Sequence, residues 1–289
     1  MPRAHANGVE LEYDTFGNPP DPALVLIMGL GAQLIDWPEE FARQLAGHGF
    51  HVIRFDNRDA GLSTWLDDLG LPDLGALLSG HGSAPYLLSD LAADTVGLLD
   101  ALDIDMAHIV GASMGGMIAQ QFVLDYPNRV RSLTSIMSTT GDQSVGRPSD
   151  AATAVLLRPP AADREGAIAS AVSGYRVFAS TGFEITDEYL RDRAMAAYDR
   201  GYHPAGGSRQ LAAILASPDR TEGLHGVTVP TAVIHGEVDQ LVDPSGGRAT
   251  AAAIPGAELL MVPGMGHDLP TGAWPQIIDL IVSTAKRAG

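Results

Sequence analysis

The sequence predicts an α/β protein: one mostly parallel sheet flanked by helices, with a helical segment inserted before a late strand. Short apolar runs, among them Ala23–Met28 and Ala107–Val110, alternate with longer stretches of helical spacing. The same alternation resumes at Thr231–His235. Between these parts, residues 141–225 are rich in Ala, Arg and Asp, with helical spacing and no apolar run typical of a β-strand. Alternating strands and helices form parallel sheets with right-handed crossovers, so the purely helical part is predicted to be an insertion.

The predicted domain organisation follows from that change of rhythm. A chain of 289 residues is longer than one average domain and shorter than two. We expect a core domain built from residues 1–140 and 226–289. We expect residues 141–225, called the helical insertion below, to lie over the sheet as a second unit.

Each predicted element has a local reason. Val9–Thr15 alternates apolar and acidic residues, which is typical of a strand with one face in water, whereas Ala23–Met28 is apolar throughout and should be covered on both faces. Pro38, Glu39 and Glu40 are typical of a first helical turn. The other predicted strands are His51–Phe55, Ala107–Val110, Val130–Met137, Thr231–His235 and Glu258–Val262, and the other predicted helices of the core run from Ser89 to about Leu102 and over Met114–Leu124, Gly246–Ile254 and Ala273–Lys286.

The composition excludes several kinds of chemistry. The chain has no cysteine, which excludes a disulfide scaffold, a thiolate metal site and a cysteine nucleophile. The formal net charge of −17 argues against a nucleic-acid partner, because no basic surface could offset it. Lys286 is the only lysine, so a lysine nucleophile or a Schiff base is not expected.

The N-terminal residues 1–21 are polar and carry acidic side chains, without the basic start and apolar run of a secretory signal. The apolar runs, such as Ala23–Met28, are far shorter than the roughly 20 residues that cross a bilayer. We therefore expect no membrane partner and a cytoplasmic location. The sequence makes no prediction about the oligomeric state.

The strongest local motif is G-x-S-x-G at residues 111–115, centred on Ser113. It lies between the apolar strand Ala107–Val110 and a predicted helix, which is the context that this motif requires. Such a turn presents the serine hydroxyl at a helix N-terminus, where backbone N–H groups favour a developing oxyanion. We interpret Ser113 as a nucleophile. The alternative, a Gly-rich phosphate-binding turn, is disfavoured because the G-x-x-x-x-G-K-[ST] pattern is missing.

A serine nucleophile needs a base that accepts its proton. Of the nine histidines, His267 follows the strand Glu258–Val262 in a loop with two glycines. Ligands and reacting groups gather at the carboxyl ends of the strands in open α/β sheets. We therefore predict that His267 is the base.

An imidazole base needs a carboxylate that holds its tautomer and stabilises its charged form. Asp239 lies four residues beyond the end of a predicted strand and upstream of His267. The order serine, aspartate, histidine along the chain matches the order expected for the G-x-S-x-G turn. Glu237, which is close to the strand, Asp243, which resembles a helix-start residue, and the more remote Asp142 are the alternatives.

The oxyanion hole is predicted to combine two backbone N–H groups. One belongs to Met114, directly after the nucleophile, and the other to the loop that follows the strand Ala23–Met28. Gly29 permits a close turn in that loop, and the N–H of Leu30 is the predicted donor.

These motifs together resemble the α/β-hydrolase family, and the similarity extends from Val9 to the final helix. Residues 56–63 (DNRDAGLS) are similar to the D-x-R-x-x-G-x-S loop of that family, which braces the loops near the site. The resemblance implies an α/β-hydrolase fold in which the helical insertion is a cap over Ser113. Haloalkane dehalogenases and epoxide hydrolases of this fold use an aspartate nucleophile, so the serine argues against both.

Within the family, the chain is most similar to bacterial serine esterases of the aclacinomycin-methylesterase kind. Most family members carry His-Gly where this chain has Met28-Gly29, and these esterases share the methionine. The similar stretches are residues 26–29 (LIMG), 37–45 (WPEEFARQL), 51–63 and 263–270 (PGMGHDLP).

The resemblance implies a carboxylic ester hydrolase that forms an acyl-enzyme on small to medium, largely apolar substrates. No metal or organic cofactor is expected, and the chain has no metal-ligand pattern such as H-E-x-x-H. A carbon–carbon bond hydrolase, a lactonase or a perhydrolase with the same three residues is the alternative, and a non-catalytic ligand-binding homologue is a third hypothesis.

A row of large side chains in the helical insertion is a candidate substrate pocket. Tyr175, Phe178 and Tyr198, with Met195 and Tyr202, recur at roughly helical spacing. They are expected to line an apolar pocket, with the alternative that they form the core of the insertion itself.

Overall fold

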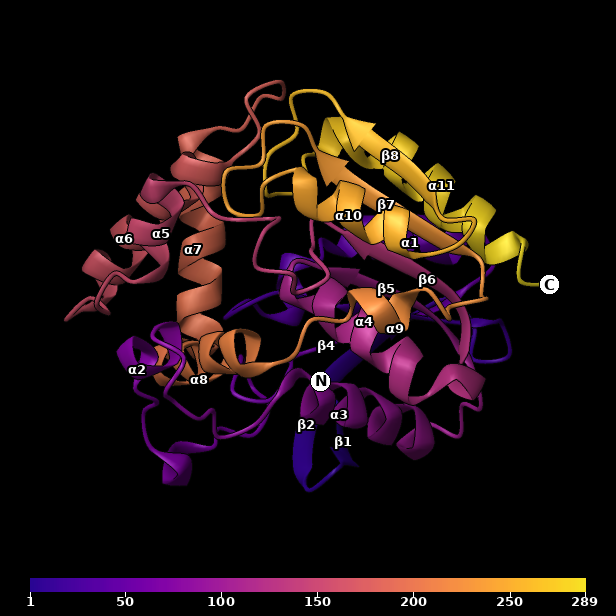
Figure 1. Ribbon diagram of the computed structural model, residues 1–289, viewed down its shortest axis with the longest axis horizontal. Helices are drawn as coiled ribbons and strands as arrows, with labels where there is room; N and C mark the ends of the chain where they lie inside the picture. Colours follow the sequence, from indigo (N-terminus) through magenta and orange to yellow (C-terminus); the bar gives the residue numbers. More distant parts are fainter.

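The computed structural model describes residues 1–289 and contains one eight-stranded sheet (Figure 1). Its strands lie in the order β1-β2-β4-β3-β5-β6-β7-β8. The strands are β1 (Arg3–Ala6), β2 (Val9–Phe16), β3 (Ala23–Ile27), β4 (His51–Phe55), β5 (Ala107–Ala112), β6 (Val130–Ile136), β7 (Thr231–Gly236) and β8 (Glu258–Val262).

The prediction of a mostly parallel sheet is confirmed. The strands from β4 through β3, β5, β6 and β7 to β8 pair in parallel, and the antiparallel pairs are β1 with β2 and β2 with β4. Strand β1 was not predicted. It is a four-residue edge strand of sequence RAHA that pairs with β2 alone, and its alternation is too short to be distinguished from a polar chain start.

Helices cover both faces of the sheet and bury a separate apolar core on each. Helices α1 (Glu39–Gly47) and α11 (Trp274–Lys286) pack on one face, and α3 (Leu88–Ala101), α4 (Met114–Asp125) and α10 (Ser245–Ala253) on the other. No helix of the protein combines the length and the apolar character needed to cross a membrane. Short 3-10 helices occur at Leu34–Asp36, Asp67–Leu69, Pro127–Arg129 and Thr271–Ala273.

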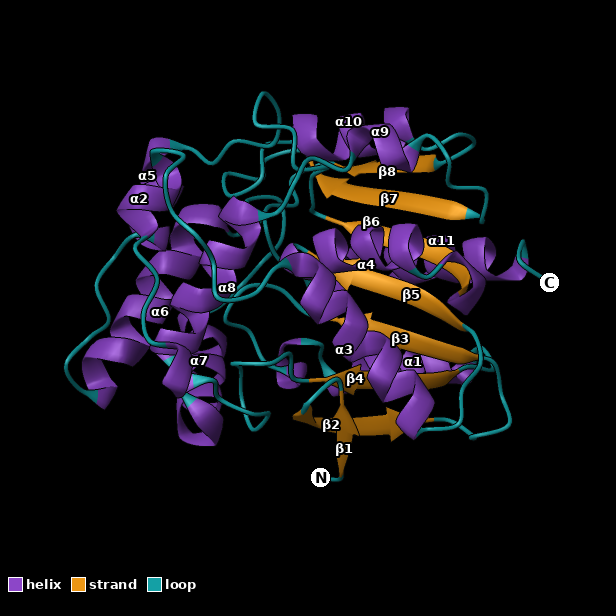
Figure 2. Ribbon diagram, turned by 60° about the horizontal axis from the view of Figure 1, so that its bottom comes forward, coloured by secondary structure: helices purple, strands orange, loops and turns teal.

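The chain between β6 and β7 is helical, and its main helices gather beyond the carboxyl ends of the parallel strands (Figure 2). Helix α2, from the core part of the chain, packs against α8 there. The helices are α2 (Leu74–Leu78), α5 (Asp150–Leu156), α6 (Arg164–Phe178), α7 (Asp187–Gly201), α8 (Pro204–Ala216) and α9 (Thr221–Leu224).

Ion pairs join the helical insertion to the loop of residues 56–63. Arg200 of α7 lies 2.6 Å from Asp56, and Arg209 of α8 lies 2.7 Å from the fully buried Asp59. Breaking a buried ion pair costs about 3–5 kcal/mol because an uncompensated charge remains. The loop thus connects the insertion to the sheet, in agreement with the bracing role that the family resemblance implies.

One buried histidine should make stability depend on pH. His108 of β5 is 3% exposed, and its Nδ1 lies 2.8 Å from the Ser132 hydroxyl. Burial, followed by the charge of Arg131, lowers the pKa of His108 to about 4. Its unfolded pKa is about 6.5, so the unfolded chain binds the proton first and stability is lost as pH falls from that value toward 4.

Between pH 7 and pH 5, we expect the wild-type protein to lose about 2 kcal/mol more unfolding free energy than His108→Asn, which keeps a partner for Ser132 but cannot titrate. Urea denaturation at both pH values measures this difference. His81→Asn, at an exposed position, is the control and should follow the wild type. The same pH dependence in His108→Asn and wild type would contradict the assignment.

Candidate active site

Ser113 occupies a strained turn between β5 and α4. Its φ of 58° and ψ of −122° lie in a region that non-glycine residues rarely adopt. The turn is possible because its neighbours lack side chains: a Cβ on Gly111 would lie 2.0 Å from the Gly115 carbonyl oxygen, and one on Gly115 would lie 2.0 Å from the Ile27 carbonyl oxygen. The strand–turn–helix arrangement expected for the motif is therefore present.

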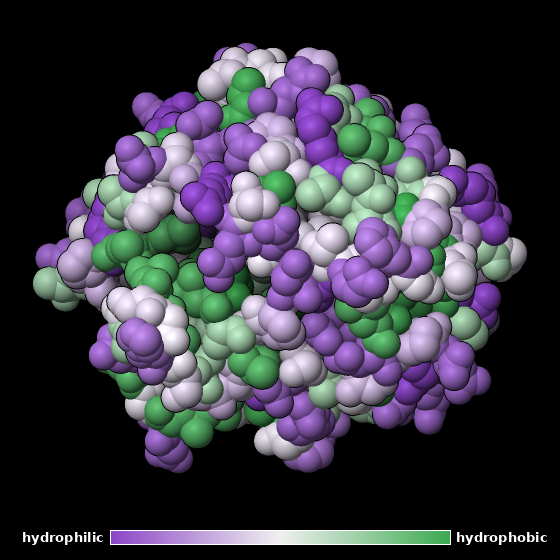
Figure 3. Space-filling model, viewed as in Figure 1, coloured by the Kyte–Doolittle hydropathy of each residue, from purple (hydrophilic) through white to green (hydrophobic).

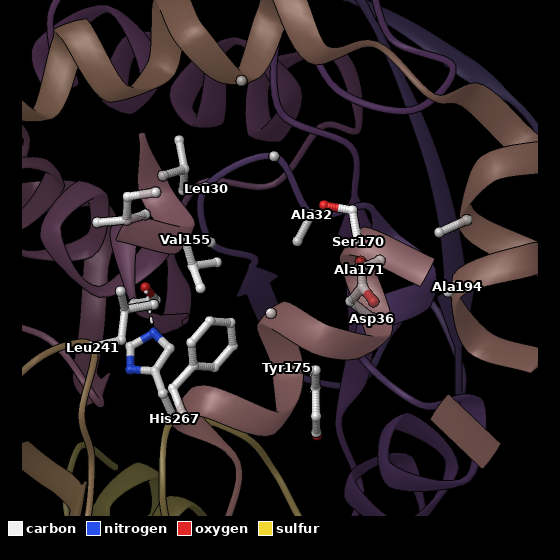
Figure 4. Close-up of a pocket in the computed structure, with 18 of the residues that line it drawn as sticks. Leu30, Ala32, Asp36, Val155, Ser170, Ala171, Tyr175, Ala194, Leu241 and His267 are labelled. Carbon is white, nitrogen blue, oxygen red and sulfur yellow. Dashed lines mark hydrogen bonds between the residues drawn. The ribbon is translucent and has the colours of Figure 1, made fainter. Parts of the chain in front are cut away.

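The three residues predicted to act together lie in one hydrogen-bonded series. Nε2 of His267 is 2.8 Å from Oγ of Ser113, and Nδ1 of His267 is 2.7 Å from Oδ2 of Asp239. A carboxylate only accepts, so Nδ1 carries the ring proton and Nε2 is free to accept the serine proton. Figure 4 shows the imidazole of His267 at the edge of a pocket, where the dashed line marks the bond between Nε2 and the Ser113 hydroxyl.

Asp239 is held as a carboxylate. Its Oδ1 accepts hydrogen bonds from the backbone N–H groups of Leu241 (2.8 Å) and Val242 (2.9 Å). Burial by itself would raise the pKa of Asp239, but the charge of His267 and hydrogen bonds from His235 and His267 outweigh burial and hold that pKa well below its usual range. His235, whose Nε2 lies 3.4 Å from Oδ2, was missed by the sequence analysis.

The alternative acids bond elsewhere. Oδ1 of Asp142 accepts from the backbone N–H of Ser144, and Oδ1 of Asp243 accepts from the backbone N–H of Ser245 at the start of α10. Glu237 is exposed. None of the three has a hydrogen bond to His267, so Asp239 alone completes the series.

Two backbone N–H groups of the segments around Ser113 have no hydrogen-bond acceptor in the protein. Met114 is the first residue of α4, where helix geometry leaves the amide without an intrahelical acceptor. The N–H of Leu30 has no acceptor in the protein. The Leu30 loop lies against the serine, because a Cβ on Gly29 would be 3.0 Å from the Cβ of Ser113.

Side chains from two other segments hold the Leu30 loop. Asn57 donates from Nδ2 to the Met28 carbonyl oxygen (2.9 Å). Gln210 of α8 accepts from the N–H of Gly31 through Oε1 (2.7 Å) and donates from Nε2 to the carbonyl oxygen of Arg58 (2.7 Å). The insertion therefore takes part in shaping this loop.

A cavity of about 570 Å³ lies over Ser113, between the core and the helical insertion. Of its 37 lining residues, 21 are hydrophobic, so an apolar ligand is favoured. Figure 3 shows a recessed hydrophobic area on the left, where Figure 1 draws α2 and α5–α8. The cavity belongs to the same region of the molecule.

The structure places two of the three main predicted pocket residues at the cavity. Tyr175 and Phe178 of α6 line the cavity. Tyr198 does not; its ring stacks on Tyr202 with centroids 4.8 Å apart and lies under the guanidinium of Arg164. The helical spacing identified the right segment, but the rotation of α7 directs Tyr198 toward α6 and away from the cavity.

Charged groups on the cavity wall are paired with each other or with polar groups. Arg193 of α7 donates to Asp36 at 2.7 Å, and both line the cavity. Arg158 donates to the hydroxyls of Ser170 (3.1 Å) and Ser173 (2.9 Å). No group of three or more His, Cys, Asp or Glu side chains is arranged to hold a metal ion.

Comparison with known families places these features in a defined class. The family profile described as alpha/beta hydrolase fold matches residues 22–270. The chain therefore belongs to the α/β-hydrolase family, as the resemblance in its sequence predicts.

Individual relatives resemble the chain over most of its length. Rhodomycin D methylesterase DauP of a Streptomyces species is 30% identical over 302 residues, which cover 97% of this chain and 96% of that protein. The 2-hydroxy-6-oxononadienedioate/2-hydroxy-6-oxononatrienedioate hydrolase of Burkholderia vietnamiensis is 30% identical over 85% of this chain and 80% of its own length. The enol-lactonase of Burkholderia xenovorans shares the fold, with a TM-score of 0.76, 22% identity and coverage of 99% and 100%.

The glycine requirement of the Ser113 turn can be measured as stability. Gly115→Ala should lower the free energy of unfolding by about 3 kcal/mol, because its methyl group would overlap the Ile27 carbonyl oxygen. Gly47→Ala, at the end of α1 with nothing within 4 Å of the added carbon, is the control and should change stability by less than about 1 kcal/mol. Chemical denaturation compares the two, and equal stabilities would contradict the packing argument.

Proposed function

We propose that the protein is a serine hydrolase that cleaves carboxylic esters of small to medium, largely apolar substrates through an acyl-enzyme intermediate. The observation that carries the proposal is the unbroken hydrogen-bonded series from Ser113 through His267 to Asp239, beside a mostly apolar cavity. In the proposal these three residues are the catalytic triad, and no cofactor takes part.

Acylation starts with proton transfer. As the Ser113 oxygen attacks the ester carbonyl, Nε2 of His267 takes the hydroxyl proton, and the carboxylate of Asp239 stabilises the resulting imidazolium. The carbonyl oxygen becomes an oxyanion, which we propose is bound by the backbone N–H groups of Leu30 and Met114. The imidazolium then gives its proton to the departing alcohol, and the acyl group remains on Ser113.

Deacylation repeats these steps with water. His267 takes a proton from the water molecule that attacks the acyl carbonyl, and the same two N–H groups bind the second oxyanion. When the tetrahedral intermediate collapses, His267 returns a proton to the Ser113 oxygen. The products are the carboxylic acid and the free serine.

We also propose that the helical insertion, residues 141–225, acts as the cap of this site. Its helices supply the cavity wall opposite Ser113, including Tyr175 and Phe178. A cavity of about 570 Å³ has room for a substrate larger than a short acyl ester. Because DauP is a methylesterase, methyl esters of bulky apolar acids are the first substrates to test.

Carbon–carbon bond cleavage is the second candidate reaction, because the relative from Burkholderia vietnamiensis is named for a dienedioate substrate. Lactone hydrolysis and perhydrolysis would use the same three residues. Initial rates on p-nitrophenyl esters of increasing acyl length, aryl methyl esters, a lactone, a ring-fission diketone and an ester with peroxide separate these reactions. A higher kcat/KM for the diketone than for every ester would replace the proposed reaction.

Ser113→Ala should reduce p-nitrophenyl ester hydrolysis to background while the fold remains, because the nucleophile is lost and only a small side chain changes. Steady-state rates and the circular dichroism spectrum measure the two effects. In parallel, a fluorophosphonate should label wild-type Ser113 and leave the variant unlabelled. An unlabelled wild type would favour a non-catalytic ligand-binding protein instead.

The cavity should discriminate by size. Ala171→Phe places a ring in the cavity and should lower kcat/KM for a bulky aryl methyl ester at least tenfold, with less than a twofold effect on p-nitrophenyl acetate. Ala169→Phe is the matched control, since Ala169 is equally exposed on the same helix but does not line the cavity. Equal losses in the two variants would show that the cavity does not receive the bulky group.

A further inference from the structure

The loop that carries His267 is bonded to the helical insertion. The backbone N–H of His267 donates to the Phe178 carbonyl oxygen (2.7 Å), and the N–H groups of Thr181 and Gly182 donate to the Gly264 carbonyl oxygen (3.0 and 2.8 Å). The approach is close: a Cβ on Gly266 would lie 2.3 Å from the Phe178 carbonyl oxygen. The end of α6 and the residues after it therefore pack directly against the loop that carries His267. This loop, residues 263–270, is called the histidine loop below.

Side chains complete this junction around the buried carboxyl group of Asp268. The N–H of Gly266 donates to Oγ of Ser180 (2.9 Å), and that hydroxyl donates to Oδ1 of Asp268 (2.6 Å). The backbone N–H of Ser180 donates to the same oxygen (2.8 Å), and the Tyr175 hydroxyl donates to Oδ2 (3.1 Å). Asp268 is 4% exposed and Ser180 is 8% exposed.

These hydrogen bonds suit an ionised Asp268. The Ser180 oxygen accepts a backbone proton, so its own proton is free to be donated to Asp268. Every partner of Asp268 donates, which is the pattern of an ionised carboxylate. Burial raises the pKa of Asp268, and the bonds from Ser180 and Tyr175 act against that rise.

We propose that Asp268, held by Ser180 of the helical insertion, is a positioning residue for His267: it fixes the histidine loop and places a second negative charge beside the imidazole. The inference rests on the proposed function, because Asp268 would position the same histidine that acts there as the base. It gives the insertion a second role besides covering the cavity. A substitution at Ser180, which lies outside the triad, should therefore affect the chemical step.

A chain of contacts connects this support to the cavity wall. Tyr175 bonds to Asp268 and also lines the cavity, and the guanidinium of Arg193 lies 5.7 Å from the centre of its ring. Arg193 in turn pairs with Asp36. A substrate that packs on Tyr175 thus touches a side chain bonded to the carboxylate next to the base.

The ionisable and charged groups around His267 can be separated by variants. Asp239 faces it from the loop after β7, and His235 of β7 contacts that carboxylate, whereas Asp268 belongs to the same loop as His267. Tyr175 faces Asp268 from α6, and Arg193 and Asp36 lie beyond that tyrosine. Substituting Asp268 therefore changes the charge beside the imidazole without changing a direct partner of its ring nitrogens.

The positioning role is tested with Ser180→Ala. For an ester that the wild type hydrolyses, we expect kcat to fall about tenfold and KM to stay within twofold. Loss of the Ser180 hydroxyl leaves His267 less well positioned, which affects the chemical step more than substrate binding. Ser180→Thr keeps the hydroxyl and should recover most of the loss. Thr181→Ala is the matched control, because it keeps the backbone bond to Gly264. Wild-type kcat in folded Ser180→Ala overturns the proposal.

The effect of the negative charge of Asp268 on His267 is tested by the pH profile of kcat/KM in Asp268→Asn. A negative charge near His267 favours the protonated ring, so removing it should move the acid limb about half a pH unit or more toward lower pH. Tyr175→Phe removes the hydroxyl that donates to Asp268 and leaves the negative charge of that carboxylate less compensated. It should therefore move the acid limb toward higher pH. An acid limb at the wild-type pH in both variants overturns the proposal, and Tyr175→Phe decides alone if Asp268→Asn does not fold.

Different results contradict the proposed function and the role of Asp268. An inactive or unlabelled wild-type protein, or an active Ser113→Ala, contradicts the proposed function itself. An active wild type with unchanged kinetics in Ser180→Ala contradicts only the role of Asp268.

Discussion

The left-handed conformation of Ser113 is the constraint on which the site depends. A residue with φ of 58° between a buried strand and a buried helix requires that the backbone around it approach very closely, which only glycine allows at positions 111 and 115. The cost of the strain is offset by the packing of β5 and α4, both buried in the centre of the protein. In return the hydroxyl projects from the carboxyl end of the sheet, next to the first free amide of α4.

Other loops reach the same point because parallel strands end at one edge. Leu30 follows β3, Asp239 follows β7 and His267 follows β8. The loops after three separate strands therefore bring their side chains or amides to the serine. The site is therefore assembled by the sheet, and each loop needs its own support. Asn57 supports the Leu30 loop, and two backbone N–H groups support the carboxylate of Asp239.

The helical insertion is bonded to the core as part of this support. Arg200 and Arg209 pair with Asp56 and Asp59, and Gln210 bonds to the Leu30 loop. The segment after α6 bonds to the histidine loop. These contacts are buried or half-buried, where ion pairs and hydrogen bonds are geometrically demanding and costly to break. The cavity walls are accordingly set by the same interactions that hold the loops of Leu30 and His267.

Local patterns in the sequence were sufficient for much of this description. The alternation of apolar runs predicted seven of the eight strands, within one or two residues at their ends, because strand burial and helix period are properties of neighbouring residues. The G-x-S-x-G turn could be predicted because glycine is required locally, where a side chain would overlap the backbone. The positions of Asp239 and His267 could be predicted because each follows a strand whose carboxyl end lies at the same edge of a parallel sheet.

Only the tertiary structure decided between residues that are equivalent in local pattern. Asp239 and Asp243 are four positions apart in one loop, and the direction of the loop brings only the first to His267. Tyr175 and Tyr198 belong to the same row of large side chains at helical spacing in the sequence. The rotation of their helices places only Tyr175 at the cavity. Ser180 and Asp268 are 88 residues apart, and no local signal connects them. Such contacts depend on how distant elements pack, which a single sequence does not encode in its local periodicity.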